Sequence, residues 1–574
     1  MRRGWLLFVI GWALVLGGGL WAHGVQTSGG IRVRDVRFVG ADGTPMSGLL
    51  YIPVTATRET PAPGVLAVHG YLNSRETQDG FAIEFARRGY VVLAIDQTGH
   101  GYSGGAATAN GYGGPDGLAY LRSLAMVDPD NIGLEGHSMG GWAVLAAAMA
   151  QPAGYKAVVL EGSATGVKVP YGAPGAMLSQ PGTADFPKNL AVVYSRYDEF
   201  APLMWEVPRA ADVGRSAKLI ALFAAKGPVV PGRLYGAIAD GSRRELYAPA
   251  TTHPGDHLSP EAIGDAADWF AKTLTGGTPR RADDQVWMWK ELATLIAFAG
   301  FVVLVLGAFD LLLGLPAFAG LAQAPEPARA RRDAGWWASL GAAALIPPLS
   351  FYPFMLAGML LVRPSHAFPQ DITNQLMVWA LLNAVITVVI NLAVRGPRPR
   401  FNIRWGASIG IALLSVGVGY AALMVCDFLF KVDFRFWVVA LKLLSPAQFG
   451  WFLRYLIPFT AYFVVALGAL HSNLAVKGEG ALAQYTTAVV ALAGGFLLFL
   501  LAQYVPLFAV GQLPVPAEAL NAIVSIQFLP LLTIVAVIAV FAWRRTNSFL
   551  PGAFICGLFV TWYIVAGTAV QFAG

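Results

Sequence analysis

The chain has 574 residues, of which 56% are hydrophobic and only 13% are charged. In a soluble globular protein about a quarter of the residues are charged, so the composition excludes a chain that is soluble throughout. The net charge of +6 does not indicate nucleic-acid binding, because the arginines cluster between apolar runs rather than on one soluble face. Charge density is ordinary from about 31 to 275, whereas long apolar runs dominate elsewhere. This division predicts one region in water and one in a membrane.

The first apolar run, 4–22, follows two arginines and is about long enough to cross a hydrocarbon core. A cleaved signal peptide has a similar charged start and apolar stretch. The small-x-small pattern expected before a cleavage site is poor here. We therefore predict an uncleaved membrane anchor over residues 1–24, and in either case export of the region that follows.

Strands and helices alternate after this anchor. Residues 31–39 and 48–54 flank a turn and predict a hairpin. Short apolar runs with turn-rich flanks follow at 65–68, 90–95, 132–135, 157–160, 190–194 and 246–248, separated by helical stretches such as 77–88, 115–126 and 141–150. This alternation predicts a mostly parallel sheet with helices on both faces over residues 31–275. Ligands are expected at the carboxyl ends of such strands.

The segment Gly136-His137-Ser138-Met139-Gly140 places a serine between glycines, where a predicted strand ends and a helix begins. A G-x-S-x-G pattern is informative when it lies at such a corner, because this turn exposes a nucleophilic serine. His69-Gly70 follows an earlier strand, and the run 96–103 (DQTGHGYS) follows the next one. These segments resemble the α/β-hydrolase superfamily of serine hydrolases, and the run 128–141 is similar to dienelactone hydrolases and prolyl-oligopeptidase relatives. The resemblance covers roughly 31–275 and implies an α/β-hydrolase domain.

Ser138 is the expected nucleophile. A serine hydroxyl is a poor nucleophile until a nearby imidazole takes its proton. As the attacked carbonyl becomes an oxyanion, two backbone N–H groups must point at it. The resemblance implies that Met139 and Tyr71 supply these two groups.

The orienting acid is expected after the predicted strand 190–194, in the chain order Ser, Asp, His. Asp198 occupies this place, with Glu199 next to it as an alternative. Glu161, after the preceding strand, is a second alternative, because some family members supply the acid there.

Two histidines, His253 and His257, lie between the last predicted strand and a helix that is expected to begin at Pro260, with Ser259 as its cap. The resemblance favours His253 as the base, because many family members place this histidine several residues before the comparable proline, and His257 is the alternative. The other histidines of the region are expected to be structural: His69, His100 and His137. The long connection 216–244 is either a lid over the pocket or a segment that packs against the sheet or membrane.

The second half predicts a multi-span domain over residues 286–574 with eight further candidate spans: 291–318, 336–362, 375–394, 406–429, 448–470, 486–508, 523–543 and 549–572. Basic residues favour the cytoplasmic side of a membrane. With the amino terminus inside, this side holds Arg2, Arg3, Arg329, Arg331, Arg332, Arg395, Arg398, Arg400, Arg404, Lys477, Arg544 and Arg545. The opposite short loops hold fewer basic residues: Arg363, Lys431, Arg435 and Lys442. The orientation predicts that residues 31–275 face the periplasm or the exterior.

Two acidic residues within the apolar runs, Asp310 and Asp427, raise a transport hypothesis, because a charge in lipid is costly and often functional. No cluster of ionisable groups repeats between two halves, as inverted-repeat transporters would show. We therefore expect Asp310 to pair inside the bundle and Asp427 to lie at the outer interface.

Together these features predict a multi-pass cell-membrane protein that is a serine hydrolase. It is expected to cleave esters of a lipid-like or hydrophobic acyl substrate through an acyl-enzyme on Ser138. Its partners are the lipid bilayer and the ester substrate, with no nucleic acid, metal or organic cofactor. The alternatives are a serine peptidase, or a transport or signalling protein whose hydrolase-like domain only binds.

Overall fold

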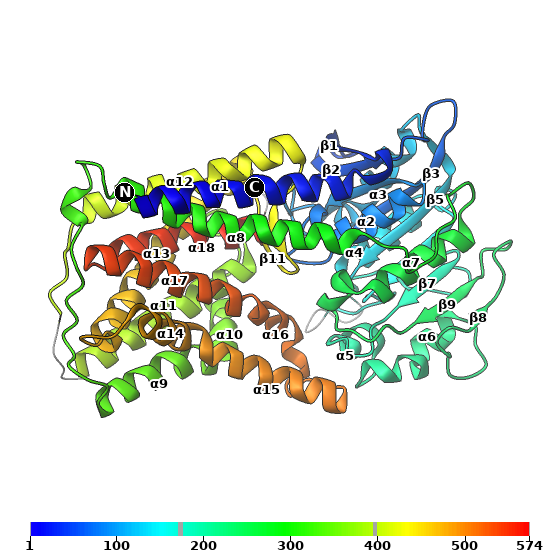
Figure 1. The fold of residues 1–574 in the computed structure, drawn as a ribbon. Helices are drawn as coiled ribbons and strands as arrows, with labels where there is room; N and C mark the ends of the chain where they lie inside the picture. Colours follow the sequence, from blue (N-terminus) through cyan, green and yellow to red (C-terminus); the bar gives the residue numbers. More distant parts are fainter. Residues whose placement is uncertain (1, 170–175, 394–398, 573–574) are drawn as a thin grey trace.

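The computed structural model describes residues 2–169, 176–393 and 399–572. A sheet with its covering helices forms one end of the molecule, and a bundle of long helices forms the other (Figure 1). The chain starts in the bundle with α1 (Arg2–Gln26), builds the sheet, and returns to the bundle through α8 (Trp287–Leu312).

Nine strands form one sheet in the order β1-β2-β4-β3-β5-β6-β7-β9-β8. The neighbours from β4 to β9 in this order are parallel, whereas β1 with β2, β2 with β4 and β8 with β9 are antiparallel. The mostly parallel sheet predicted from the sequence is confirmed. Of the nine strands in this sheet, only β8 was not predicted, because a strand of two residues shows no periodicity. The strands are β1 Arg32–Val39, β2 Pro45–Ile52, β3 Ala62–Val68, β4 Val91–Asp96, β5 Val127–His137, β6 Ala157–Glu161, β7 Leu190–Val193, β8 Leu234–Tyr235 and β9 Arg244–Tyr247.

Helices cover both faces of the sheet. On one face, Leu66 of β3 belongs to the apolar core that includes side chains of α3 (Gly114–Ser123) and α4 (Met139–Ala150). On the other face, its neighbour Val65 belongs to the core with α2 (Asp79–Arg87) and α7 (Pro260–Thr273). Successive strand residues point to opposite faces, so a strand covered on both sides is apolar throughout.

In the described part of the chain, the bundle has eight spans that are long and apolar enough to cross a membrane, or nine if the bent pair α9–α10 is one span. Two of the eight consist of two helices each, α14 with α15 and α16 with α17. Length and composition therefore agree with a multi-pass membrane protein. Besides α1 and α8, its helices are α9 Ala334–Leu349, α10 Phe351–Leu361, α11 Asp371–Ala393, α12 Trp405–Phe430, α13 Pro446–Leu474, α14 Ala481–Val489, α15 Gly495–Val510, α16 Ala519–Ile526, α17 Phe528–Thr546 and α18 Leu550–Gly567. Between α12 and α13 the chain forms a hairpin of β10 (Phe434–Phe436) and β11 (Val439–Leu441).

Two of the predicted spans extend five or six residues past the observed helices, and a third is bent. The span expected at 291–318 ends at Leu312, and that expected at 549–572 ends at Gly567. The span expected at 336–362 is bent by 52° at its break, after Pro347 and Pro348. Each of these prolines lacks an N–H donor and clashes with the preceding turn, which bends a helix. Arg395 and Arg398, used in the topology prediction, lie outside the described residues.

Helices α1 and α8 lie side by side along the bundle (Figure 1). Glycines bring their backbones together, because a Cβ atom at Gly11 would lie 2.6 Å from Leu304 Cα and one at Gly307 would lie 2.5 Å from Phe8 N. Small residues at such an interface allow close van der Waals packing where lipid gives helices no hydrophobic drive to associate. The first helix is therefore an integral part of the bundle.

The two acidic residues of the apolar runs have ordinary structural surroundings. Asp310 forms an ion pair with Arg545, so the expected pairing is confirmed, although the pair lies in the last turns of α8 and α17 rather than deep in the bundle. Asp427 lies in the last turn of α12, where its backbone carbonyl accepts a hydrogen bond from Lys431 N. The chain continues from this turn into the β10–β11 hairpin at the sheet end of the bundle.

Candidate active site

Ser138 occupies the sharp corner between β5 and α4. Its backbone has φ 55° and ψ −120°, a left-handed conformation that is strained for a residue with a side chain. The turn is possible because Gly140 packs against the backbone of β3, where an added Cβ would lie 2.0 Å from Val68 O. At Gly136 an added Cβ would lie 2.3 Å from the oxygen of Gly140. The corner therefore has the geometry of a nucleophile elbow.

The structure brings His253 and Asp198 together. His253 Nδ1 lies 2.8 Å from Asp198 Oδ2, and both side chains are buried. Asp198 also accepts hydrogen bonds from the backbone N of Phe200 at 2.7 Å and from the hydroxyl of Tyr194 at 3.0 Å. Because Nδ1 is held by the carboxylate, Nε2 is the ring nitrogen left for a substrate or nucleophile.

Charges around His253 favour its protonated form. Burial by itself lowers the pKa of a histidine, but Asp198, Glu199 and Asp256 outweigh burial and raise the pKa of His253. His137 supports the backbone of the same residue, since its Nε2 lies 2.9 Å from the carbonyl oxygen of His253. A ring with these partners is suited to accept a proton and to be stabilised as imidazolium.

The alternative base, His257, has a different environment. Neither of its ring nitrogens has a hydrogen-bond partner among the described residues. Burial, followed by the neighbouring His137 and His253, lowers its pKa well below the ordinary value. Its ring packs edge-on against Phe81 at 6.0 Å between centroids. The structure therefore pairs only His253 of the two candidates with a carboxylate.

The alternative acids also lie near the corner. The carbonyl oxygen of Glu161 accepts a hydrogen bond from Ser138 N at 2.8 Å, but its buried carboxylate has no partner among the described residues. Burial, with the charge of Asp256 next, raises the pKa of Glu161 well above its ordinary value. Glu199 Oε2 accepts from the backbone N of His253 at 2.8 Å. Asp198 is thus the acid that contacts the ring, and Glu199 contacts the backbone.

The two residues implied as oxyanion donors flank the corner. Met139 is the first residue of α4, and Tyr71 follows Gly70, where an added Cβ would lie 3.0 Å from Ser138 Cβ. The Tyr71 hydroxyl accepts a hydrogen bond from Gln571 Nε2 at 2.7 Å. The residue before Gln571, Val570, exchanges backbone hydrogen bonds of 2.8 Å with Gly99 and Ala107. The carboxyl-terminal segment therefore holds the loop beside the corner, which no sequence signal indicated.

One cavity of about 260 Å³, the site cavity, joins these residues. Ser138, His253, His257, Tyr71 and Met139 all line it. The connection 216–244 contributes nothing to its lining, and part of this connection forms β8 at the far edge of the sheet. The wall opposite the corner comes instead from the bundle: Val438 of the hairpin, and Leu520, Ile523, Val524 and Gln527 in and after α16. The sequence did not predict this wall.

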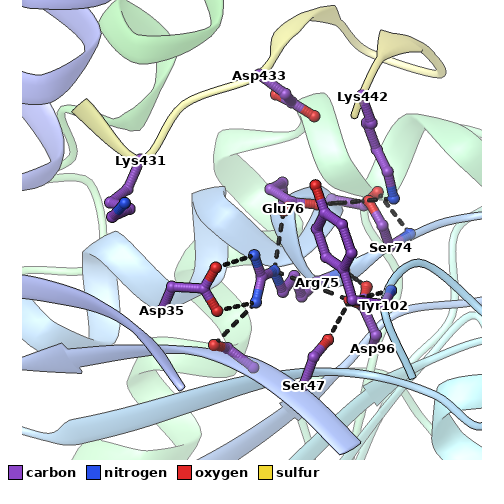
Figure 2. A network of polar contacts seen from close by, with 12 residues as sticks. Asp35, Ser47, Ser74, Arg75, Glu76, Asp96, Tyr102, Lys431, Asp433 and Lys442 are labelled. Atoms are coloured by element: carbon purple, nitrogen blue, oxygen red, sulfur yellow. Dashed lines mark hydrogen bonds and ion pairs between the residues drawn. The ribbon is translucent and has the colours of Figure 1, made fainter. Parts of the chain in front are cut away.

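A network of buried charges joins the sheet to the bundle beside this cavity (Figure 2). Arg75 binds Asp35 at 2.8 Å and Glu76 at 3.0 Å. From the hairpin side, Arg435 lies 3.8 Å and Lys442 lies 3.9 Å from Glu76. Burial raises the pKa of Glu76, but the three cations outweigh it and hold that pKa well below its ordinary value. Because breaking such a buried network is costly, it fixes the hairpin against the loop that carries Tyr71.

In the part of the chain that the structure describes, no group of three or more His, Cys, Asp or Glu side chains is placed to hold a metal ion. At the corner, the Ser138 hydroxyl and the His253 imidazole line one cavity, and the imidazole contacts the Asp198 carboxylate. This set can transfer an acyl group by general base and nucleophilic chemistry.

Comparisons with known proteins match the region of the sheet. The family model described as serine aminopeptidase, S33, matches residues 59–198. Together with the strand order and the elbow, this match identifies the α/β-hydrolase fold. No match appears among curated proteins.

Several solved structures are similar to part of this chain. An esterase of Pyrococcus furiosus, Pf2001, is 17% identical, with 42% of this chain and 91% of that chain covered and a TM-score of 0.32. Carboxyl esterase 2 of the mycorrhizal fungus Tuber melanosporum is 18% identical, with 42% and 86% covered and a TM-score of 0.30. The thioesterase domain of the curacin biosynthetic pathway is 15% identical, with 42% and 99% covered and a TM-score of 0.28.

Proposed function

We propose that the protein is a membrane-anchored serine hydrolase that cleaves esters of hydrophobic acyl groups. One observation carries the proposal. Ser138, in a strained turn, lines the same cavity as His253, whose ring is held by Asp198 at 2.8 Å. These residue types at a strand-to-helix corner are those of a Ser-His-Asp triad, which recurs on unrelated folds with the same division of roles.

In the proposed reaction, Ser138 Oγ attacks the ester carbonyl while His253 Nε2 takes the hydroxyl proton. The backbone N–H groups of Met139 and Tyr71 stabilise the oxyanion. When the tetrahedral intermediate collapses, the alcohol leaves with the proton from His253, and the acyl group stays on Ser138. Water then attacks this ester, gives its proton to His253, and releases the acid as the proton returns to Ser138 Oγ. Asp198 stabilises the imidazolium throughout.

The lining of the site cavity favours an ester over the substrate of an aminopeptidase. Among the described residues that line it, none is an aspartate, glutamate, lysine or arginine. The charged amino terminus of a peptide would lose its hydration there without a compensating carboxylate, which is unfavourable. An uncharged acyl group on the other hand gains from contact with side chains such as Phe200, Leu203 and Ile523.

A serine-directed fluorophosphonate probe tests the nucleophile on the full chain in detergent. Labelling of the wild type and loss of labelling in Ser138→Ala are expected, because the probe's phosphorus bonds to Ser138 Oγ as fluoride leaves. Hydrolysis of a p-nitrophenyl butyrate should be lost in the same variant, and an aminoacyl p-nitroanilide should be cleaved far more slowly by the wild type. Equal labelling of both proteins, or of neither, would contradict the proposal and favour a binding or transport role.

We also propose that the hydrolase domain faces the periplasm or the exterior, as the distribution of basic residues between the spans indicates. The two native cysteines, Cys426 and Cys556, are buried, so introduced cysteines report on sidedness. In intact cells, a membrane-impermeant thiol reagent should label Thr57→Cys in the hydrolase domain and not Gln323→Cys at the other end of the bundle, both positions being exposed. The opposite pattern would reverse the orientation.

A further inference from the structure

A second cavity, the bundle cavity, lies among the helices next to the site cavity. Its volume is about 100 Å³. It shares five lining residues with the site cavity: Leu72, Asn73, Val438, Val524 and Gln527. Two cavities with five lining residues in common are neighbouring chambers, and Ser138 lines one of them.

The bundle cavity extends along apolar helices that have the length and composition of membrane spans. It is lined by Leu376 and Trp379 of α11, Phe459 and Phe463 of α13, Leu531 of α17 and Ile564 of α18. At a helical rise of 1.5 Å per residue, Trp379 lies about 12 Å along α11 from its first residue, Asp371. The chamber thus leads from the hydrolase end into the interior of the bundle.

The charged residues at this cavity do not make it a site for a charged group. Arg435 and Lys442 line its end nearest the hydrolase domain. Arg435 is already paired with Asp433, and both cations lie within 3.9 Å of Glu76. Most of the remaining lining is aromatic and aliphatic, with Asn73, Ser74, Thr77, Gln527 and Thr568 as its uncharged polar members. A mainly apolar surface of this kind suits an apolar ligand.

We propose that the bundle cavity binds the far end of the hydrocarbon chain of the ester that Ser138 attacks, so that the substrate is a long-chain ester whose tail passes from the site cavity to a position between α11, α13, α17 and α18. This inference rests on the proposed function, because it places the scissile carbonyl at Ser138. It gives the bundle a part in substrate selectivity. The hydrolase domain binds the reacting group, and the helices determine which chain lengths fit.

A variant that shortens the bundle cavity tests this inference. Ala380 lines the cavity and is buried on α11, so Ala380→Leu adds volume where the tail would lie. The matched control is Ala469→Leu, which makes the same change in a third cavity among α9, α11 and α13 that has only Tyr462 in common with the bundle cavity. The full chain, reconstituted in nanodiscs, is assayed with p-nitrophenyl esters from butyrate to myristate. The ratio of variant to wild-type kcat/KM at each length removes the effect of partitioning into lipid.

The ratio for Ala380→Leu should stay within twofold of one for butyrate and fall at least tenfold for myristate. The ratio for Ala469→Leu should stay near one at every length. A uniform fall at all lengths, or no fall for myristate, would overturn the inference while leaving the serine hydrolase intact. Failure of the wild type to cleave any ester would instead contradict the proposed function.

If the wild type cleaves no ester, a measurement that does not depend on catalysis still tests whether the bundle cavity binds a hydrocarbon chain. Myristic acid with a diazirine at its terminal carbon, irradiated with the wild type, should cross-link to peptides from α11, α13 or α17. Ala380→Leu should lose most of this labelling, and Ala469→Leu should keep it. Cross-links only to outward-facing parts of the bundle, unchanged in Ala380→Leu, would show that the cavity does not take the chain.

Discussion

The hydroxyl of Tyr504, on α15 of the bundle, donates a hydrogen bond of 3.0 Å to Oε1 of Glu199, the residue after Asp198. The other carboxylate oxygen of Glu199 accepts from the backbone N of His253 at 2.8 Å. Burial, followed by the charge of Asp198, raises the pKa of Glu199 to about 7. Nearby, Tyr197 and Phe508 pack edge to face with ring centroids 5.1 Å apart. The bundle is therefore connected by one side chain to the backbone of the proposed base.

Tyr504→Phe should lower kcat about fivefold and leave KM nearly unchanged, because the lost hydrogen bond of about 1 kcal/mol positions His253 without touching substrate. A hydrogen-bond donor favours the ionised carboxylate, so its removal raises the pKa of Glu199. Less negative charge then faces His253, and the acid limb of the pH–rate profile should move to lower pH. Tyr485→Phe on α14 is the control. An unchanged profile together with an unchanged kcat would show that the contact only packs the two parts together.

The two histidines of the site cavity should respond differently to substitution. His253→Ala should lower kcat at least 10³-fold, as expected when a triad base is removed. His257→Gln should retain activity within tenfold, because neither ring nitrogen of His257 has a hydrogen-bond partner among the described residues. Steady-state kinetics with p-nitrophenyl butyrate measure both. Comparable losses in the two variants would show that the base is misassigned.

The pH dependence follows from the carboxylates that face His253. The ring accepts the serine proton only when it is neutral, so activity rises with pH through its pKa. Asp198, Glu199 and Asp256 raise this pKa above the ordinary 6.5, and the midpoint of the acid limb should therefore lie above pH 6.5. Asp198→Asn removes a raising charge, so the midpoint should move down while kcat falls about 10³- to 10⁴-fold. An unchanged midpoint would show that Asp198 does not interact with the base.

Local patterns predicted the strand-to-helix corner at Ser138, because a strand, two glycines and a helix adjoin in the sequence. Asp198 and His253 were predicted from chain order and resemblance, and the structure places their side chains in contact. The contact of Tyr504 with Glu199 spans 305 positions and that of Gln571 with Tyr71 spans 500. Such contacts leave no periodicity in one sequence, since they arise from the packing of whole domains.

The covering of the site was harder to predict for the same reason. The connection 216–244 has the length of a lid, yet the wall over Ser138 comes from α16, which follows nearly 400 positions later in the numbering. In the sequence, α16 is an apolar run. Such a run is equally compatible with facing lipid, packing against another helix or lining a pocket. The bend between α9 and α10 was not predicted either, since 336–362 was expected to be one span, although the tandem prolines Pro347 and Pro348 remove two helical donors there.

Close packing at the corner gives a test of the turn itself. Gly140→Ala would place Cβ 2.0 Å from Val68 O and 2.5 Å from His69 O, both backbone atoms that cannot move without displacing β3. Activity should be lost, and the free energy of unfolding should fall by about 3 kcal/mol. Gly17→Ala on α1, where an added methyl group meets open space, is the control. Melting curves in detergent measure the stability, and a Gly140→Ala protein as active and stable as wild type would contradict the geometry of the elbow.

Glu135, on β5 three residues before Ser138, makes stability depend on pH. Gln78 Nε2 donates to both carboxylate oxygens, at 2.8 and 2.9 Å, but burial dominates and raises the pKa of Glu135 to about 8. A carboxyl group with a folded pKa above its unfolded value of about 4.5 stabilises the fold fully below pH 4.5, and this contribution is lost as pH rises through 8. Glu135→Gln removes the titration and keeps the shape.

The Glu135→Gln variant should therefore melt at the same temperature as wild type near pH 5. Near pH 9 it should be more stable by roughly 1 to 3 kcal/mol, the usual cost of an imperfectly compensated buried polar group. Melting curves of both proteins in detergent across this range give the difference, in which the titration of every other group cancels. A constant difference between pH 5 and 9 would mean that Glu135 does not change its ionisation in the folded protein over this range, and a variant less stable at pH 9 would mean that the carboxylate is fully compensated by Gln78.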